Sequence, residues 1–131
     1  MDKLFAKLYG HDEKIIEHQK NRYREILAKF KELFPQSTGE IQFFSTPGRT
    51  EVGGNHTDHN HGRVLAAGVN LDAVAAAAKT DDTVITVYSK GYKDAFVVDI
   101  NDLEIKEKER ETTFALIRGI AARFKELGYN I

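Results

Sequence analysis

Apolar side chains recur at helical spacing in two segments of the chain. Residues 12–34 (DEKIIEHQKNRYREILAKFKELF) predict a helix, because apolar residues lie on one side and Glu, Lys and Arg lie opposite. The apolar set is Ile16, Tyr23, Leu27, Phe30 and Phe34, and Pro35 is expected to end the helix. A second helix is predicted near residues 112–128, with Gly128 as its stop. Its apolar face comprises Phe114, Ile117, Ile120, Ala121, Phe124 and Leu127.

The segments between the helices have the pattern of strands. IQFFSTP (residues 41–47) predicts a short strand, and VLAAGV and AVAAAAK predict two buried ones interrupted by glycine and asparagine. KTDDT is a turn signal and predicts a hairpin between AVAAAAK and VITVYSK, while DAFVVDI (residues 94–100) is a further strand. The order of elements predicts an α+β fold. We expect a mixed, largely antiparallel sheet with an N-terminal and a C-terminal helix, in one domain over residues 1–131.

Composition narrows the class of protein. The chain has 131 residues, of which 41% are hydrophobic and 30% charged, which indicates a globular protein. A formal net charge of −1 offers no electrostatic footprint for nucleic acid or an anionic membrane. There is no cysteine, which excludes disulfides and thiolate metal sites. The charged N-terminus lacks the apolar core of a signal peptide, and no apolar run approaches the roughly 20 residues of a membrane span. We therefore expect a soluble, cytoplasmic protein.

The chemistry is concentrated in residues 47–62, PGRTEVGGNHTDHNHG, which the pattern assigns to neither helix nor strand. Its glycines permit positive φ angles and close approach of a ligand to the main chain. Arg49 offers a fork of donors suited to phosphate oxygens or a carboxylate. Asp58 accepts hydrogen bonds, whereas Asn55 and His56 can both donate and accept, which suits neighbouring hydroxyls. Because the adjoining strands look buried, we expect Arg49, His56 and Asp58 to be held inside the fold.

Two other interpretations of this run are open. His56, Asp58, His59 and His61 could supply nitrogen and oxygen ligands to a divalent metal ion. The spacing of His56 and His59 is not the helical i, i+4 spacing, and no second histidine cluster exists, so the metal signal is weak. The other interpretation is a polar surface turn without a ligand, which for His59 and His61 is at least as good as a direct role.

The run resembles the galactokinase signature, through Pro47-Gly48-Arg49 and then Gly54-Asn55-His56-Thr57-Asp58. The flanks are also similar, so the resemblance covers roughly residues 40–131. It implies the N-terminal domain of the small-molecule kinase fold shared by galactokinase, homoserine, mevalonate and phosphomevalonate kinases, and phosphoryl transfer from ATP with magnesium. On this resemblance Arg49 is catalytic, near the reacting hydroxyl and the γ-phosphate. Gly54, Asn55, His56 and Asp58 bind the sugar, and no residue binds a metal.

The sequence departs from that family in two ways. Asn55 stands where the family has an acidic residue and His59 where it has tyrosine, so the expected ligand is galactose or a related hexose. These departures keep a non-catalytic sugar sensor open as the alternative. No glycine-rich ATP loop follows, which leads us to expect a truncated chain, inactive alone and without a cofactor of its own. Its partner is then a small sugar, and surface exposed by truncation could drive self-association.

Overall fold

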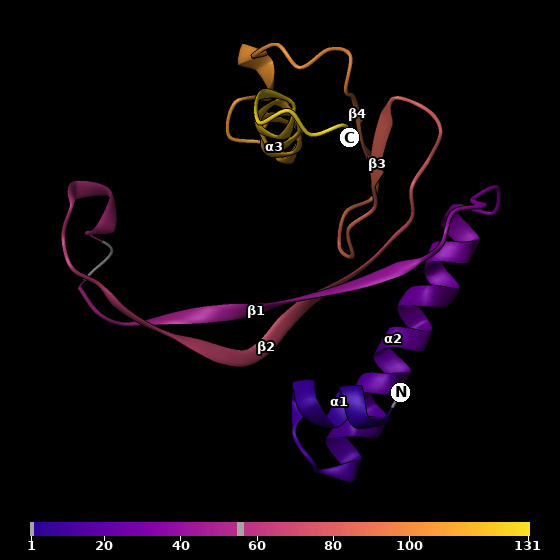
Figure 1. Ribbon diagram of the computed structural model, residues 1–131, viewed down its shortest axis with the longest axis vertical. Helices are drawn as coiled ribbons and strands as arrows, with labels where there is room; N and C mark the ends of the chain where they lie inside the picture. Colours follow the sequence, from indigo (N-terminus) through magenta and orange to yellow (C-terminus); the bar gives the residue numbers. More distant parts are fainter. Residues whose placement is uncertain (1, 55–56) are drawn as a thin grey trace. The chain divides into compact units, whose positions relative to one another are not determined.

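The computed structural model describes residues 2–54 and 57–131, the side chain of Asp58 excepted. The chain divides into two compact units, residues 1–79 and residues 80–131. The fold is α+β with antiparallel strand pairs, as the sequence predicted. Figure 1 shows the elements of each unit, which we describe separately.

The first unit begins with two helices that pack against each other, α1 (Asp2–Tyr9) and α2 (Glu13–Leu33). The pattern predicted α2 within one residue at each end but gave no sign of α1. Asp12 is the N-cap of α2, because its Oδ1 accepts a hydrogen bond from the Lys14 amide at 2.8 Å. Phe5 of α1 is buried and lies 5.1 Å from the ring of Tyr23, measured between ring centroids. This aromatic contact joins the two helices.

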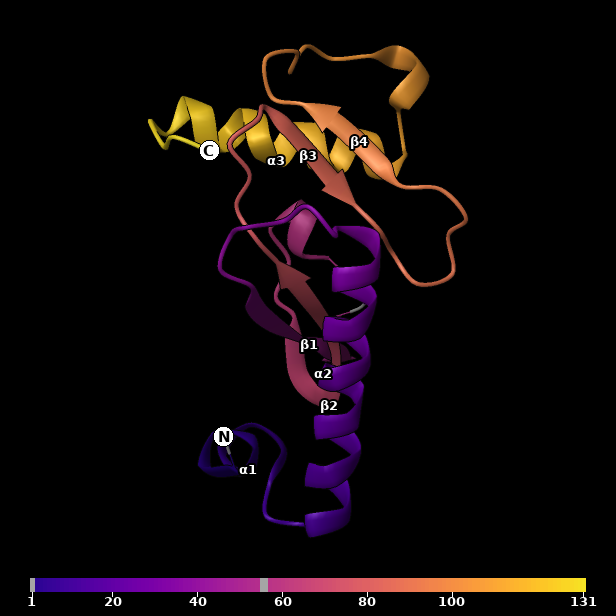
Figure 2. The ribbon, with the colours of Figure 1, turned by 90° about the vertical axis from the view of Figure 1, so that its right-hand side faces the viewer.

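Strands β1 (Gln42–Gly53) and β2 (Leu65–Ala77) form a long antiparallel ribbon, visible in Figures 1 and 2. Two predictions were wrong here. The strand expected to end at Pro47 continues to Gly53, because register shifts between Pro47 and Arg49 and between Glu51 and Gly53 absorb the irregular residues. The two strands expected after the run are one, since Gly68 and Asn70 are accommodated without ending β2.

The ribbon is also far more exposed than the sequence predicted. Every residue of β1 is exposed, and the half-buried residues of β2 are Val69, Asp72, Val74 and Ala76. A two-stranded ribbon has two open faces, and α2 packs on one side of β2 (Figure 2). The expectation that the adjoining strands are buried was therefore wrong, and Arg49, which was expected inside the fold, is exposed. His56 and the side chain of Asp58 lie outside the described residues.

The second unit contains β3 (Val84–Val87), β4 (Phe96–Asp99) and helix α3 (Thr113–Glu126). β3 pairs antiparallel with β4, and β2 pairs with β1, so the predicted hairpin across KTDDT had the wrong partners. Phe96 and Val98 alternate inward along β4 and are buried, and the Phe96 ring lies 5.2 Å from that of Phe114 on α3. Figure 2 shows α3 beside these strands.

The ends of α3 follow the sequence signals. The Thr112 side chain accepts from the Ala115 amide at 3.4 Å. At the other end Gly128 has φ +81°, its amide bonds to the Lys125 carbonyl at 3.0 Å, and the Tyr129 amide bonds to the Phe124 carbonyl at 3.0 Å. This pair of bonds is the Schellman motif, which favours glycine at the left-handed position. The prediction that Gly128 ends this helix is confirmed.

A buried arginine that the pattern did not predict anchors the loop before α3. Arg118 is 6% exposed and binds Glu109 twice, through Nε at 2.9 Å and Nη2 at 3.0 Å, and its Nη1 donates to the Asp102 carbonyl. Glu109 belongs to the short helix η2 (Glu107–Glu109). The hydrogen bond from Arg118 is the main reason why the pKa of Glu109 lies below its usual range.

We expect Arg118→Met to lower the urea midpoint of unfolding of the second unit, because it leaves the carboxylate of Glu109 without its partner. Arg123→Met is the matched control on the same helix, since Arg123 is exposed and pairs with Glu126 at the surface at 3.0 Å. A surface pair of this kind contributes little to stability. Equal midpoints for the two variants would show that the buried pair has no structural role.

Candidate functional site

Arg49 lies on the exposed ribbon, immediately after a bulge. In the register Pro47 pairs with Asp72 and Arg49 with Gly68, so Gly48 alone faces three residues of β2. A Cβ on Gly48 would lie 3.1 Å from Val69 Cγ2, which is tighter than most real contacts. Arg49 stands opposite a residue without a side chain, and no hydrogen bond or ion pair to it is formed within the described part of the chain. Its guanidinium is available for an anionic or hydroxylated ligand.

The segment after β1 turns back on itself through a series of main-chain bonds. Gly54 has φ +106°, and its carbonyl accepts from the Thr57 amide at 3.2 Å and from Thr57 Oγ1 at 2.8 Å. The Thr57 carbonyl in turn accepts from the amides of Asn60 and Gly62, at 3.0 and 2.8 Å. Between them is the short 3₁₀ helix η1 (Asp58–Asn60). We call residues 54–62 the tip loop, because they lie between the end of β1 at Gly53 and the start of β2 at Leu65.

The predicted site residues are only partly described. Arg49 and Gly54 are described, the first on β1 and the second directly after it. Asn55 and His56 lie outside the described residues, and so does the side chain of Asp58, although its main chain opens η1. The roles assigned to Arg49, Gly54, Asn55, His56 and Asp58 remain predictions.

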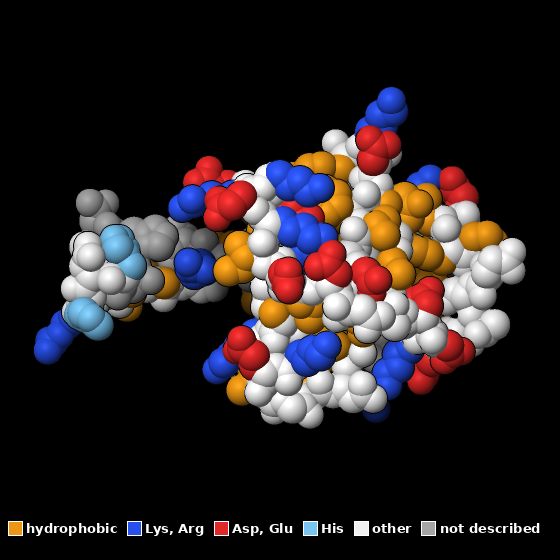
Figure 3. Space-filling view, turned by 90° about the horizontal axis from the view of Figure 1, so that it is seen from above, with side chains coloured by type: hydrophobic (Ala, Val, Ile, Leu, Met, Phe, Trp, Pro, Cys, Tyr) orange, Lys and Arg blue, Asp and Glu red, His pale blue; other side chains and the backbone are white. Residues whose placement is uncertain are grey.

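Two histidines of the tip loop are described by the structure, and both lie at the surface. His59 and His61 are exposed, and the pale-blue side chains at the left of Figure 3 show histidines on the molecular surface. Among the described residues no group of three or more His, Cys, Asp or Glu side chains could hold a metal ion. Because the proposed metal set includes His56 and Asp58, the metal interpretation stays untested.

The structure assembles a polar cluster that the sequence did not reveal, around Asp72 of β2. We call the side chains of Tyr9, Arg22, Ser45 and Asp72 the Asp72 cluster. The carboxylate of Asp72 is 8% exposed and accepts from Tyr9 Oη at 2.7 Å, from Ser45 Oγ at 2.6 Å and from Arg22 Nη1. Arg22 Nη2 also donates to the Asp72 main-chain carbonyl at 2.7 Å. The cluster joins α1, α2, β1 and β2.

The cluster shifts the pKa of its members. Burial alone would raise the pKa of Asp72, but hydrogen bonds from Ser45, Arg22 and Tyr9, with the charge of Arg22, outweigh it and lower the pKa to about 2. Burial, together with hydrogen bonds to Tyr23 and Asp72, raises the pKa of Tyr9. Asp72 is therefore ionised and Tyr9 neutral at neutral pH.

The lowered pKa of Asp72 predicts an acid-sensitive contribution to stability. The folded pKa of about 2 lies below the ordinary value of 3.8, so the stabilisation is complete above about pH 4 and is lost as pH falls toward 2. It amounts to about 2 kcal/mol, roughly half of which is lost by pH 3.

The check is urea unfolding of the natural chain and of Asp72→Asn at pH 7, 4 and 3. The difference in free energy of unfolding between the two proteins should become smaller as pH falls from 7 to 3. The pKa values of Asp2, Asp102 and Glu109 are also lowered, but these groups contribute equally to both proteins. A difference that stays constant across this range would contradict the assignment.

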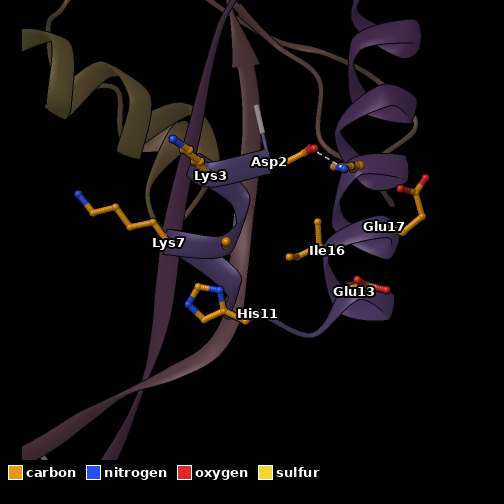
Figure 4. Close-up of a pocket in the computed structure, with 9 residues that line it drawn as sticks. Asp2, Lys3, Lys7, His11, Glu13, Ile16 and Glu17 are labelled. Carbon is orange, nitrogen blue, oxygen red and sulfur yellow. Dashed lines mark ion pairs between the residues drawn. The ribbon is translucent and has the colours of Figure 1, made fainter.

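A second surface feature is an open groove between α1 and α2, drawn in Figure 4. Asp2 points across it to α2 and pairs with Lys20 at 2.6 Å. The other lining side chains are of both charges, including Lys3, Lys7 and Glu13. This mixture does not select one class of ligand.

Within the described residues, no helix is long and apolar enough to cross a membrane.

Comparison with known proteins bears on residues 47–62. A family model described as the galactokinase galactose-binding signature matches residues 28–79, which include Arg49 and the tip loop. The chain is similar to the galactokinase of Streptococcus suis, with 36% identity over 109 residues, and to that of Lactococcus lactis subsp. lactis, with 30% over 106 residues. These matches cover 82% and 81% of this chain but only 27% and 26% of the two relatives.

A solved structure agrees with the sequence matches. The crystal structure of Lactococcus lactis galactokinase complexed with galactose matches 83% of this chain with a TM-score of 0.71 and 27% sequence identity. This chain is galactokinase-like. It spans about a quarter of the length of the galactokinases that it matches, and 28% of the crystallised chain. The galactokinase resemblance predicted from the sequence is thus confirmed, and the matched region is the one that carries the galactose-binding signature.

Proposed function

We propose that this chain is the sugar-binding part of a galactokinase-like sugar 1-kinase, for galactose or a related hexose. The observation that carries the proposal is the signature match over residues 28–79, together with similarity to a galactokinase that was crystallised with galactose. An exposed ribbon that carries Arg49, with a positive φ at Gly54 directly after it, supports a surface that receives a small polar ligand.

In this proposal the role of each site residue follows from its charge, its hydrogen-bonding groups or its backbone conformation. Arg49 stabilises the negative charge that develops on the transferred phosphoryl group near the sugar's reacting hydroxyl. Asp58 accepts from two neighbouring hydroxyls, and His56 and Asn55 add donors and acceptors. Gly54, at φ +106°, lets the main chain turn closely around the sugar.

ATP and magnesium enter this proposal only for a polypeptide with further sequence. The residues of this chain do not fit an ATP-phosphate site, because the chain has no GxGxxG or P-loop pattern. The part of the reaction proposed for this chain is therefore to bind and orient the acceptor hydroxyl and, through Arg49, to stabilise charge on the group transferred to it.

Sugar-dependent ADP release tests the proposal. The longest polypeptide that contains this chain is incubated with ATP, magnesium and separate hexoses, and galactose or a close epimer is expected to give turnover. Arg49→Lys is expected to lower kcat more than it raises KM, because a lysine keeps the charge but loses the forked geometry. Absence of turnover with every hexose would remove the kinase assignment.

A second candidate is a sugar sensor on the same scaffold, favoured by Asn55 and His59 at the positions where the resemblance implies an acidic residue and a tyrosine. It predicts saturable sugar binding without ADP release. Restoring the acidic side chain with Asn55→Glu, alone or with His59→Tyr, should then tighten galactose binding without creating turnover. Turnover in the unaltered protein would exclude the sensor.

A further inference from the structure

The position of Arg49 depends on the register of the β1–β2 ribbon, which the hydrophobic pattern does not determine. Register is set strongly where one face of a sheet is buried, and weakly where both faces are open. All of β1 is exposed, and so are the residues of β2 that face Arg49, Thr50 and Glu51. A slip of one residue would turn the side chains of β1 to the opposite face. Something other than a core must fix this end of the ribbon.

The bulge before Arg49 is the point at which such a slip would occur. Pro47 has no amide hydrogen to donate to the strand ladder, and Gly48 alone faces three residues of β2. A Cβ added at Gly48 would lie 3.1 Å from Val69 Cγ2 and 3.4 Å from the Leu71 carbonyl oxygen, so the two strands leave little room for a side chain here. The last paired position before this bulge is Pro47 opposite Asp72.

The Asp72 cluster holds this position from both strands and from α2. Arg22 binds Asp72 twice, through the carboxylate and through the main-chain carbonyl at 2.7 Å, which fixes the backbone of β2. Ser45, two residues before Pro47 on β1, donates to the same carboxylate at 2.6 Å. A buried polar group with partners on several elements specifies one alignment, because any slip would leave it unsatisfied.

We propose that Asp72 is a positioning residue of the sugar site: with Arg22 and Ser45 it fixes the ribbon's register at the bulge and thereby the face on which Arg49 is presented. The effect on sugar rests on the proposed function, whereas the effect on register does not. Asp72 acts through Arg49, since its own carboxylate is 8% exposed and already accepts from three side chains.

The test compares Asp72→Asn with Glu109→Gln in the 131-residue chain. Both variants replace the carboxylate of a buried ion pair by an amide, but Glu109 belongs to the other unit. Galactose affinity is measured by calorimetry, and register by cross-strand nuclear Overhauser contacts between Thr50 and Ala67, which are partners in the ribbon. We expect Asp72→Asn to weaken these contacts and to raise the Kd for galactose about 5- to 10-fold, and Glu109→Gln to change neither.

Each outcome either supports or overturns the positioning role of Asp72. A folded Asp72→Asn chain with the original contacts and a Kd within about twofold overturns the proposal, as does an equal loss of affinity in Glu109→Gln. If Asp72→Asn does not fold, Ser45→Ala, which keeps the Arg22 pair, is expected to raise the Kd about 2- to 3-fold, and an unchanged value overturns the proposal. If the natural chain binds no galactose, the proposed function fails, while weakened contacts in Asp72→Asn still support the register role.

Discussion

Gly54→Ala is expected to abolish measurable sugar binding and to destabilise the tip loop. An added Cβ would lie 2.5 Å from the Arg63 carbonyl oxygen and 2.6 Å from Val64 Cα, distances that real Cβ atoms do not show. The position also has φ +106°, which L side chains rarely adopt. Because both obstacles are main-chain atoms, Gly54 and residues 63–64 must move apart. The strain amounts to about 1–3 kcal/mol, and calorimetric titration with galactose is the measurement.

Gly53→Ala is the matched control, one residue earlier in the chain. Nothing lies within 4 Å of a Cβ at Gly53, so the same chemical change is tolerated there. We expect its galactose affinity to equal that of the natural chain. If the two alanine variants bind equally well, the shape of the turn at Gly54 is irrelevant to the sugar, and its assignment to the site fails.

Asp58→Ala is expected to cost about 2–3 kcal/mol of sugar binding, a loss of roughly 30- to 150-fold in affinity. The physical reason is the removal of a charged acceptor that, in the proposal, serves two hydroxyls of the sugar. Asp58→Asn should cost less, because the amide keeps one acceptor oxygen in nearly the same place.

Asp81→Ala serves as the control for Asp58→Ala, since Asp81 is an exposed carboxylate in the second unit. Its removal changes net charge by the same amount, and it lies outside residues 28–79, which match the signature. A comparable loss of sugar affinity in the two variants would point to a general effect of net charge. Unchanged affinity in Asp58→Ala would remove this residue from the sugar site.

The elements with strong local signals could be predicted from the sequence. α2 and α3 have helical periodicity, a capping side chain and a proline or glycine after the last turn, and their ends lie within a few residues of the prediction. β3 and β4 are short runs rich in valine. In these segments local propensity and tertiary structure agree.

Elements whose structure depends on distant contacts could not be predicted. α1 has only eight residues, three of them charged, and only the packing of Phe5 and Tyr9 on Tyr23 shows why it forms. Pro47 and Gly53 are local signals for a break, but bulges opposite β2 accommodate them within one strand. Pairing between residues far apart in the sequence, such as Gln42 with Ala77, leaves no local trace.

The residues of the sugar site were predicted from the resemblance, whereas the Asp72 cluster that supports the ribbon was not predicted at all. Arg49 and Gly54 were singled out by motif, and the positive φ at Gly54 agrees with the reason given for glycine there. Arg22 lies on the side of α2 that the pattern assigned to solvent, and Asp72 looked like part of a break. A buried ion pair is seen only when both partners are placed, although an aspartate in the middle of an apolar strand is a signal that could have been followed.

The most direct test of the sugar-binding assignment is a galactose titration of the ¹⁵N-labelled chain followed by amide chemical shifts. We expect saturable shifts at Arg49, Gly54 and Thr57 with a Kd in the millimolar range, and unmoved amides along α3. Glucose, which differs at one hydroxyl, should bind more weakly. Absence of saturable shifts in residues 49–62, or equal shifts along α3, would contradict the assignment of the sugar to this ribbon and its tip loop.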